Sequence, residues 1–248
     1  MIKRITDFDS LSGVSSPLFP LIFSDCMFTE EEYGGAFAQY NENGDIAAIF
    51  SALNGCVNFF ATKKTDYSEI SDFFAFSGIK EITSDTLLPI MKNASEYDFL
   101  TYQGDFLIID ECEKLSPYSS HGDYKNIYGL LCENGENFDD WFLRLSKKIN
   151  NNSALAVFCE ENGEVVSALT VPAVFKNNAV IAGVATKTEY RRKGYASKCV
   201  RSAVSQLFSC GVDEIGLWCG KENIPFYEKN GFIKKSKIYV GECENELF

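Results

Sequence analysis

Two segments of this 248-residue chain follow one pattern, and this repetition constrains the fold more than any other feature of the sequence. Residues 37–53 read FAQYNENGDIAAIFSAL, and residues 156–172 read AVFCEENGEVVSALTVP. Each has an alternating apolar run, a polar turn with Asn-Gly and a second apolar run. Because Asn and Gly supply the positive φ angles of a type I′ turn, both segments predict β-hairpins. A pattern that occurs twice indicates two copies of one fold.

The segments that follow the two hairpins also agree with each other. Each copy continues with an apolar strand that ends in Ala-Thr-Lys, NFFATKK at 58–64 and VIAGVATK at 180–187. After a helical segment, each has a short strand that contains Glu-Ile, GIKEI at 78–82 and GVDEI at 211–215. The same order of elements in both halves favours tandem domains.

We therefore expect an α/β (α+β) protein with two tandem domains, residues 1–115 and 116–248. Each domain is expected to be a mixed, mostly antiparallel sheet flanked by helices. In the second copy the patterns predict, in order, a strand at about 126–133, a helix at 138–149, the hairpin at 154–172, a strand at 179–186, a helix at 196–209, a strand at 213–219, a helix at 223–230 and a strand at 232–241.

The second copy has extra residues that the first copy lacks, in the loop TEYRRKGYAS before its long helix. Residues 187–201 contain six basic residues and one acidic residue, in a chain whose net charge is −12. A glycine in such a turn lets the backbone approach a ligand, and the unpaired N–H groups of the following helix attract anions. The loop therefore predicts an anion site that suits a pyrophosphate.

The residues of this loop resemble a known family. Arg191-x-x-Gly194-x-Ala196 is similar to the Arg/Gln-x-x-Gly-x-Gly/Ala signature of the GCN5-related N-acetyltransferases, the GNAT superfamily. NIPFYEKNGF at 223–232 resembles the second motif of that family, and the resemblance covers about residues 126–241. It implies transfer of an acyl group, with acetyl-CoA or another acyl-CoA as co-substrate, to a primary amine of a small molecule.

The resemblance also implies roles for individual residues. The backbone of Val184 and Thr186, in the predicted strand 179–186, would pair with the pantetheine arm. Tyr227 would act as the general acid that protonates the departing thiolate. The amine would attack directly, with a backbone N–H near Val184 stabilising the oxyanion, and Gly183 would mark a bulge that opens the site. The implied cofactor-binding residues are Val184, Ala185, Thr186, Arg191, Arg192, Lys193, Gly194, Tyr195, Ala196, Ser197 and Asn223.

One departure from the family concerns the general base. The strand NAVIAGVAT carries no acidic residue, where many members of the family place a glutamate. Glu189 lies in the phosphate loop, and Glu160 and Glu161 are expected to be solvated hairpin residues. A non-catalytic acyl-CoA sensor is therefore an alternative, and a tandem aminoacyl-transferase that uses charged tRNA is a third reading. The first copy, which has no phosphate loop, is expected to be degenerate.

The charge and composition of the chain argue against several other classes of protein. Residues 1–115 carry 7 bases and 19 acids, whereas the remaining 16 bases and 16 acids cancel in residues 116–248. Such an acidic chain is expected to bind extended nucleic acid poorly, because the phosphate backbone repels it. No apolar run is long enough for a membrane span. Nine cysteines without a C-x-x-C pair indicate reduced thiols in the cytoplasm. His121 is the only histidine, so we expect no metal site and exclude zinc bound by histidines.

Overall fold

The computed structural model describes the chain except residues 8–10, 12–14, 28–33, 106–111, 133–136 and 245–248. The described residues form two compact units. Unit 1 contains residues 1–99, 218–224 and 234–248, and unit 2 contains residues 100–217 and 225–233.

These units do not coincide with the contiguous division into 1–115 and 116–248 that the sequence suggests. The reason lies in two long strands, β6 (Met91–Tyr102) and β12 (Phe232–Cys243), each of which contributes residues to both units. The end of β12 pairs antiparallel with β5 (Glu81–Ser84), with Tyr239 opposite Ser84. The last strand of the chain therefore completes the sheet of unit 1.

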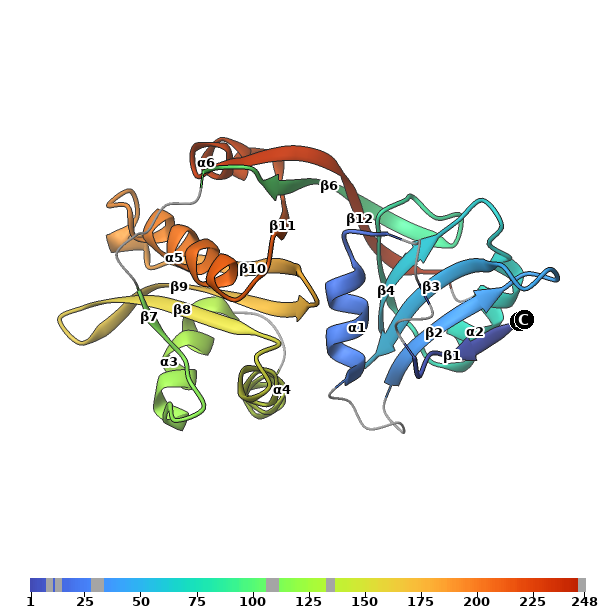
Figure 1. The fold of residues 1–248 in the computed structure, drawn as a ribbon, viewed down its shortest axis with the longest axis horizontal. Helices are drawn as coiled ribbons and strands as arrows, with labels where there is room; N and C mark the ends of the chain where they lie inside the picture. The colour runs from blue at the N-terminus through green and yellow to red at the C-terminus, as the bar shows by residue number, and fades with distance from the viewer. Residues whose placement is uncertain (8–10, 12–14, 28–33, 106–111, 133–136, 245–248) are drawn as a thin grey trace. The chain divides into compact units, whose positions relative to one another are not determined.

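Unit 1 is a sheet with the strand order β1-β2-β3-β4-β5-β12-β6 (Figure 1). Its helix α2 (Tyr67–Phe76) packs on the sheet through Ile70 and Phe74, which are fully buried against Phe50, Phe59 and Ile82. Its other elements are β1 (Ile2–Arg4), α1 (Phe19–Met27), β2 (Gly34–Tyr40), β3 (Ile46–Leu53) and β4 (Cys56–Ala61).

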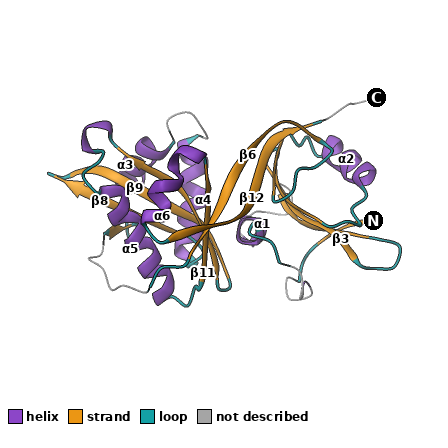
Figure 2. Cartoon of the chain, turned by 90° about the horizontal axis from the view of Figure 1, so that it is seen from above, coloured by secondary structure: helices purple, strands orange, loops and turns teal. Residues whose placement is uncertain are grey.

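Unit 2 is a sheet with the order β11-β10-β9-β8-β7 and helices on both faces (Figure 1, Figure 2). Helix α5 covers one face, and α3 and α4 pack on the other through Tyr124, Ile127 and Trp141. The elements that lie wholly in this unit are β7 (Glu113–Lys114), α3 (His121–Leu131), α4 (Phe138–Asn150), β8 (Leu155–Glu161), β9 (Glu164–Phe175), β10 (Asn178–Thr186), the 3-10 turn η2 (Thr188–Tyr190) and α5 (Tyr195–Ser209). Strand β11 (Glu214–Cys219) and helix α6 (Ile224–Lys229) lie mostly in unit 2, and the 3-10 turn η3 (Lys221–Asn223) lies in unit 1.

The two units share one strand topology. In unit 1, β2, β3 and β4 pair antiparallel in sequence, and β5 then pairs parallel to β4 after the crossover helix α2. In unit 2, β8, β9 and β10 pair antiparallel, and β11 pairs parallel to β10 after α5. The repeated order of elements and the mixed, mostly antiparallel α/β class predicted from the sequence are thus confirmed.

The predicted strand at 126–133 is wrong, because these residues belong mainly to helix α3. Ser120 and Asp123 form a capping box, in which each side chain accepts a hydrogen bond from the backbone of the other residue. Tyr124 and Ile127, one turn apart, bury one face of the helix. The short apolar run NIYGLL fits either a strand or a helix, and the cap at Ser120 decides for the helix.

The two Asn-Gly turns also differ from each other. Asn162 and Gly163, with φ of 53° and 79°, form the expected two-residue turn between β8 and β9. The loop between β2 and β3 is longer, and only Gly44 has a positive φ there. The Asn41 side chain accepts the N–H groups of Asn43 and Asp45, so an Asx turn shapes this loop instead of a type I′ turn.

Candidate functional site

Strand β10 changes character halfway along its length. Its parallel ladder with β11 contains the pairs from Asn178 to Val180, and among the described residues it ends there. The register with β9 shifts twice beyond Val180, and Gly183 has a φ of 58°, which confirms the bulge predicted at this glycine. Residues 178–181 are largely buried, whereas 182–186 are partly exposed. The second half of β10 therefore presents backbone that β11 does not cover.

Beyond β10, the chain folds into a loop whose backbone is shaped to hold an anion. Arg192 and Gly194 have φ of 63° and 93°, and Gly194 is the N-cap of α5. Such left-handed residues turn successive N–H groups toward one side, as in a nest. Gly194 brings no side chain to accept the first-turn N–H groups, and the helical ladder begins with Lys198 N–H to Gly194 O at 2.9 Å. The N–H groups of Tyr195, Ala196 and Ser197 come before this first bond, so they have no acceptor within the helix.

The basic side chains of the loop are held by neighbours in unit 2. Arg191 Nε donates to the carbonyl oxygen of Thr186 at 3.1 Å. The Lys193 ammonium lies 4.8 Å from the centre of the Tyr190 ring. Arg192 is exposed, and its left-handed backbone turns the chain toward Gly194. The loop thus keeps a positive charge around the start of α5.

The predicted residue Tyr195 connects this loop to the hairpin. Its hydroxyl donates to the Glu161 carboxylate at 2.6 Å, and this bond raises the pKa of Tyr195. Glu160 and Glu161 are both exposed, as the sequence suggests, but Glu161 is tied to the first residue of α5. No acidic side chain lies on β10 to serve as a general base.

A residue that the sequence analysis missed, Asn230, fastens α6 to the start of α5. Its buried side-chain amide donates to Ser197 Oγ at 3.2 Å and to Phe226 O at 2.8 Å. Its Oδ1 accepts from Arg201 at 3.5 Å. Asn230 lies within the NIPFYEKNGF motif, so the sequence did point to this segment. Its role was not predictable, because its partners Ser197 and Arg201 are 33 and 29 residues away in sequence.

The predicted general acid, Tyr227, lies on α6 in the same unit. Its ring is half-buried and packs edge-on against Phe226 and Phe232, at centroid distances of 4.9 and 5.9 Å. Its carbonyl accepts the N–H of Asn230 at 2.9 Å. Tyr227 is therefore placed one turn before the residue that binds the α5 start.

A cavity of about 250 Å³ opens beside these residues in unit 2. The charged groups at its wall are Arg201, Lys229 and Asp105, and the rings of Tyr102 and Phe208 give it an apolar side. The ring centroids of Tyr102 and Phe208 lie 5.7 Å apart. A flat ring with an anionic group would suit such a wall, because an apolar face and two cations meet there.

The structure does not bring every predicted residue into one unit. Val184 to Ser197 and Tyr227 belong to unit 2, whereas Asn223 lies in the segment 218–224 of unit 1. There Asn223 ends η3, is exposed, and donates through its side-chain amide to Glu222 at 3.4 Å. Asn223 is therefore the one predicted residue that is not part of unit 2.

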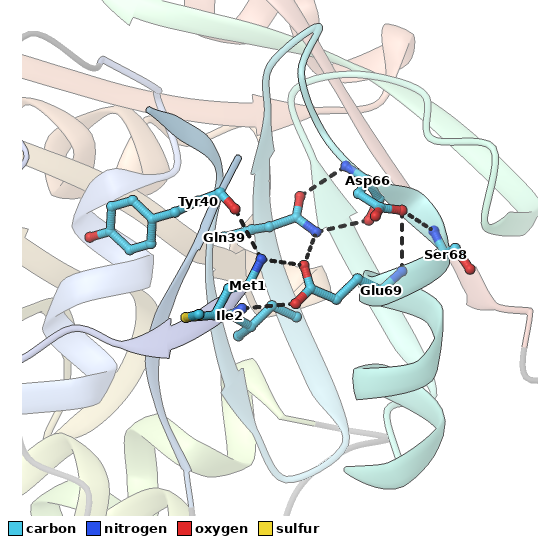
Figure 3. Close-up of polar contacts among 7 residues, drawn as sticks. All are labelled: Met1, Ile2, Gln39, Tyr40, Asp66, Ser68 and Glu69. Atoms are coloured by element: carbon cyan, nitrogen blue, oxygen red, sulfur yellow. Dashed lines mark hydrogen bonds and ion pairs between the residues drawn. The ribbon is translucent and has the colours of Figure 1, made fainter. Parts of the chain in front are cut away.

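The helix of unit 1 that corresponds to α5 begins with different chemistry. The N-cap of α2 is Asp66, and its carboxylate accepts the N–H groups of Ser68 and Glu69 at 3.0 and 3.3 Å (Figure 3). Glu69 adds a second carboxylate in the first turn. The N–H groups that an anion would use are thus taken by an internal carboxylate, which fits the absence of a glycine loop before this helix.

Met1 and Gln39 also bind the acidic first turn of α2. The Met1 ammonium donates to Glu69 Oε2 and to Tyr40 O, both at 2.9 Å (Figure 3). Gln39 Nε2 donates to Glu69 Oε2 at 2.8 Å and to Asp66 O at 2.9 Å. Burial opposes ionisation of Glu69, but these donors outweigh it and hold the pKa of Glu69 below its ordinary value.

One part of the chain matches a family of known enzymes. The model of the acetyltransferase (GNAT) family matches residues 120–232, which include β10, the Gly194 loop, α5 and α6. Residues 120–232 are a GNAT domain. The resemblance drawn from Arg191, Gly194 and the NIPFYEKNGF motif is thereby confirmed.

Solved structures of GNAT proteins share the fold over most of the chain. An acetyltransferase of the GNAT family from Novosphingobium aromaticivorans has a TM-score of 0.61 at 13% identity, covering 92% of this chain and 98% of its own. A GCN5-related N-acetyltransferase from Kribbella flavida has a TM-score of 0.60 at 16% identity, covering 79% and 86%. An acetyltransferase from Colwellia psychrerythraea has a TM-score of 0.54 at 11% identity, covering 98% and 99%. At these identities the likeness extends to the fold alone.

No curated protein is similar enough in sequence to count as a match. Within the described ranges, no helix has the length and apolar character needed to cross a membrane.

Proposed function

We propose that this protein is an acyl-CoA-dependent N-acyltransferase that moves an acetyl group to a primary amine of a small molecule. The observation that carries the proposal is the start of α5, where a left-handed glycine cap leaves the first-turn N–H groups without a side-chain acceptor. This opening follows directly on the uncovered half of β10. An extended arm that ends in a pyrophosphate requires those two features in that order.

Every predicted cofactor-binding residue except Asn223 has a task in this proposal. The backbone of Val184, Ala185 and Thr186 would pair with the pantetheine arm along β10. The N–H groups of the segment 192–197 would hold the pyrophosphate, with Arg191 and Lys193 supplying charge. The cavity beside Arg201 would take the adenosine end, because its wall combines rings and cations.

The chemistry assigned to the chain is proton transfer and charge stabilisation. Tyr227 Oη would give its proton to the thiolate as the amine attacks the carbonyl carbon in a ternary complex. A backbone N–H near Val184, freed by the Gly183 bulge, would stabilise the developing oxyanion. Because β10 carries no acid, the amine would enter unprotonated or lose its proton to water.

Tyr227→Phe tests the assigned acid. We expect the variant to lower kcat by about 10²-fold, the usual range for loss of a general acid, while the Kd of acetyl-CoA stays within about two-fold. Steady-state kinetics and titration calorimetry measure the two quantities separately. Phe226→Leu, a change in the neighbouring ring, is the control for packing. An equal loss of binding and turnover in Tyr227→Phe would reject the acid role.

The activity itself is tested by incubating the protein with acetyl-CoA and a panel of amines, with mass spectrometry of the products. The panel contains amino sugars, amino acids, polyamines, aminoglycosides and peptides with free N-termini. We expect at least one member to gain an acetyl group only when protein is present. Binding of acetyl-CoA without transfer to any amine would instead favour the non-catalytic sensor.

A further inference from the structure

Three cysteine side chains meet in the interior of unit 2, close to the start of α5. Cys112 precedes β7, Cys159 lies on β8 and Cys199 lies in the second turn of α5. All three are buried, with at most 7% of each residue exposed. Cys112 Sγ lies 3.4 Å from Cys159 Sγ, which lies 3.5 Å from Cys199 Sγ, and all three sulfurs are within 4.8 Å of one another.

This spacing suits a metal ion better than it suits packing alone. A point equidistant from three sulfurs so arranged lies roughly 2.0–2.4 Å from each, which includes the Zn–S bond length of about 2.3 Å. Thiolates are the ligands that zinc and other thiophilic ions prefer. Three elements that are far apart in sequence hold the sulfurs, so the fold itself creates the cluster.

Oxygen donors lie beside the sulfur triangle. Ser202 Oγ, itself buried, accepts the N–H of Cys112 at 3.0 Å. The carbonyl oxygen of Ser167 lies 3.7 Å from Cys199 Sγ, and that of Tyr195 lies 4.0 Å from Cys159 Sγ. A tetrahedral zinc ion with three sulfur ligands requires one further donor, and an oxygen donor is at hand.

We propose that Cys112, Cys159 and Cys199 form a site for one thiophilic divalent metal ion of the zinc type, completed by an oxygen donor. The ion binds the three sulfurs as thiolates, and the protons that they still carry pass to the buffer. The site is distinct from histidine ligation, which the single His121 excludes, and it has no C-x-x-C spacing that the sequence would reveal. The ion would clamp α5 to β8 and to the segment before β7.

The test is an anaerobic titration of the full-length, reduced, chelator-treated protein with Co²⁺, followed by displacement with Zn²⁺. We expect one equivalent of Co²⁺ to produce thiolate-to-metal charge-transfer absorption and the visible bands of a tetrahedral site. Cys112→Ser and Cys199→Ser should each weaken binding at least 30-fold, whereas Cys210→Ser, which changes an exposed thiol, should leave it unchanged. Absence of the charge-transfer absorption in the wild-type protein would overturn the proposal.

A measurement on the wild-type protein covers the case in which a cysteine variant fails to fold. X-ray absorption of the protein with one equivalent of Zn²⁺ should give three sulfur ligands at about 2.3 Å. A first shell of nitrogen and oxygen alone would contradict the site. Binding that survives unchanged in Cys112→Ser and is lost in Cys210→Ser would also contradict it, since the ligands would then lie on the surface.

Discussion

Among single residues, Gly194 and Asp66 stand at the same point of the two repeated units and give two helix starts opposite chemistry. Gly194 caps α5 in a left-handed conformation without a side-chain acceptor, whereas the carboxylate of Asp66 accepts two first-turn N–H groups of α2. A helix N-terminus attracts an anion only while its N–H groups are open to one. Together with the basic loop before α5, this difference at the cap separates the unit proposed to bind acyl-CoA from the unit that would not.

Gly194→Asp should give α5 the cap that α2 already has. Asp tolerates the left-handed region better than most residues, so the fold is expected to persist. Its carboxylate would occupy the anion position and repel the pyrophosphate, and we expect the Kd of acetyl-CoA to rise at least 100-fold. Titration calorimetry measures it. Gly194→Asn, of equal size but neutral, is the matched control and should bind at least ten-fold more tightly than the aspartate variant. Equal affinities for the two variants would show that charge at this cap is irrelevant.

Among the secondary-structure elements, those with a regular apolar stripe were predictable and those defined by distant partners were not. Helix α5 was expected from the spacing of Cys199, Val200, Ala203 and Leu207, and these residues are buried. Helix α3 was missed, although Ser120 and Asp123 supply a cap that the sequence displays. The Asn230 bridge to Ser197 could not be read locally, because it joins residues 33 positions apart.

The pH dependence of unit 1 follows from the hydrogen bonds that join α2 to β2 and Met1. Since these bonds hold the pKa of Glu69 below its ordinary value of 4.5, its contribution to stability is present above that value and is lost as the pH falls through the lower, folded-state pKa. The Glu69 side chain is 35% exposed, so screening limits the loss in Glu69→Gln to about 0.5 kcal/mol at pH 7. Urea unfolding at pH 7 and pH 3 measures it.

The expected pattern is a difference between the wild type and Glu69→Gln at pH 7 that becomes smaller at pH 3, as the carboxylate is protonated. Glu42→Gln, in the exposed loop between β2 and β3, is the control and should match the wild type at both values. A Glu69→Gln deficit that is undiminished at pH 3 would mean that the side chain stabilises the unit through shape and not through charge.

For the chain as a whole, the sequence predicted two copies of a fold but not how their strands are shared. Contiguous copies would each keep their own last strand, yet β12 pairs with β5 in unit 1, and Tyr102 at the end of β6 packs on Phe208 and Phe232 in unit 2. The sequence pattern does not reveal which unit a strand joins, because the alternation of apolar and polar residues would be the same in either unit. Pairing partners depend on the folded chain and not on local pattern.

Separate expression of residues 1–115 and 116–248 tests this sharing. We expect neither fragment to unfold cooperatively alone, because each lacks a strand that the matching unit uses. Mixing or co-expressing the two fragments should restore one cooperative transition close to that of the intact protein. Circular dichroism melting measures both. A fragment 1–115 that melts cooperatively at the temperature of the full chain would contradict the shared sheet.

One of the two similar units is proposed to bind acyl-CoA, through the edge of β10 and the start of α5. Hydrogen–deuterium exchange of the full-length protein with and without acetyl-CoA tests it at both units at once. We predict slower exchange in residues 184–186 and 192–197 when acetyl-CoA is present, and no change in residues 66–69 at the start of α2. Unchanged exchange in 192–197, or protection at 66–69 instead, would contradict the account.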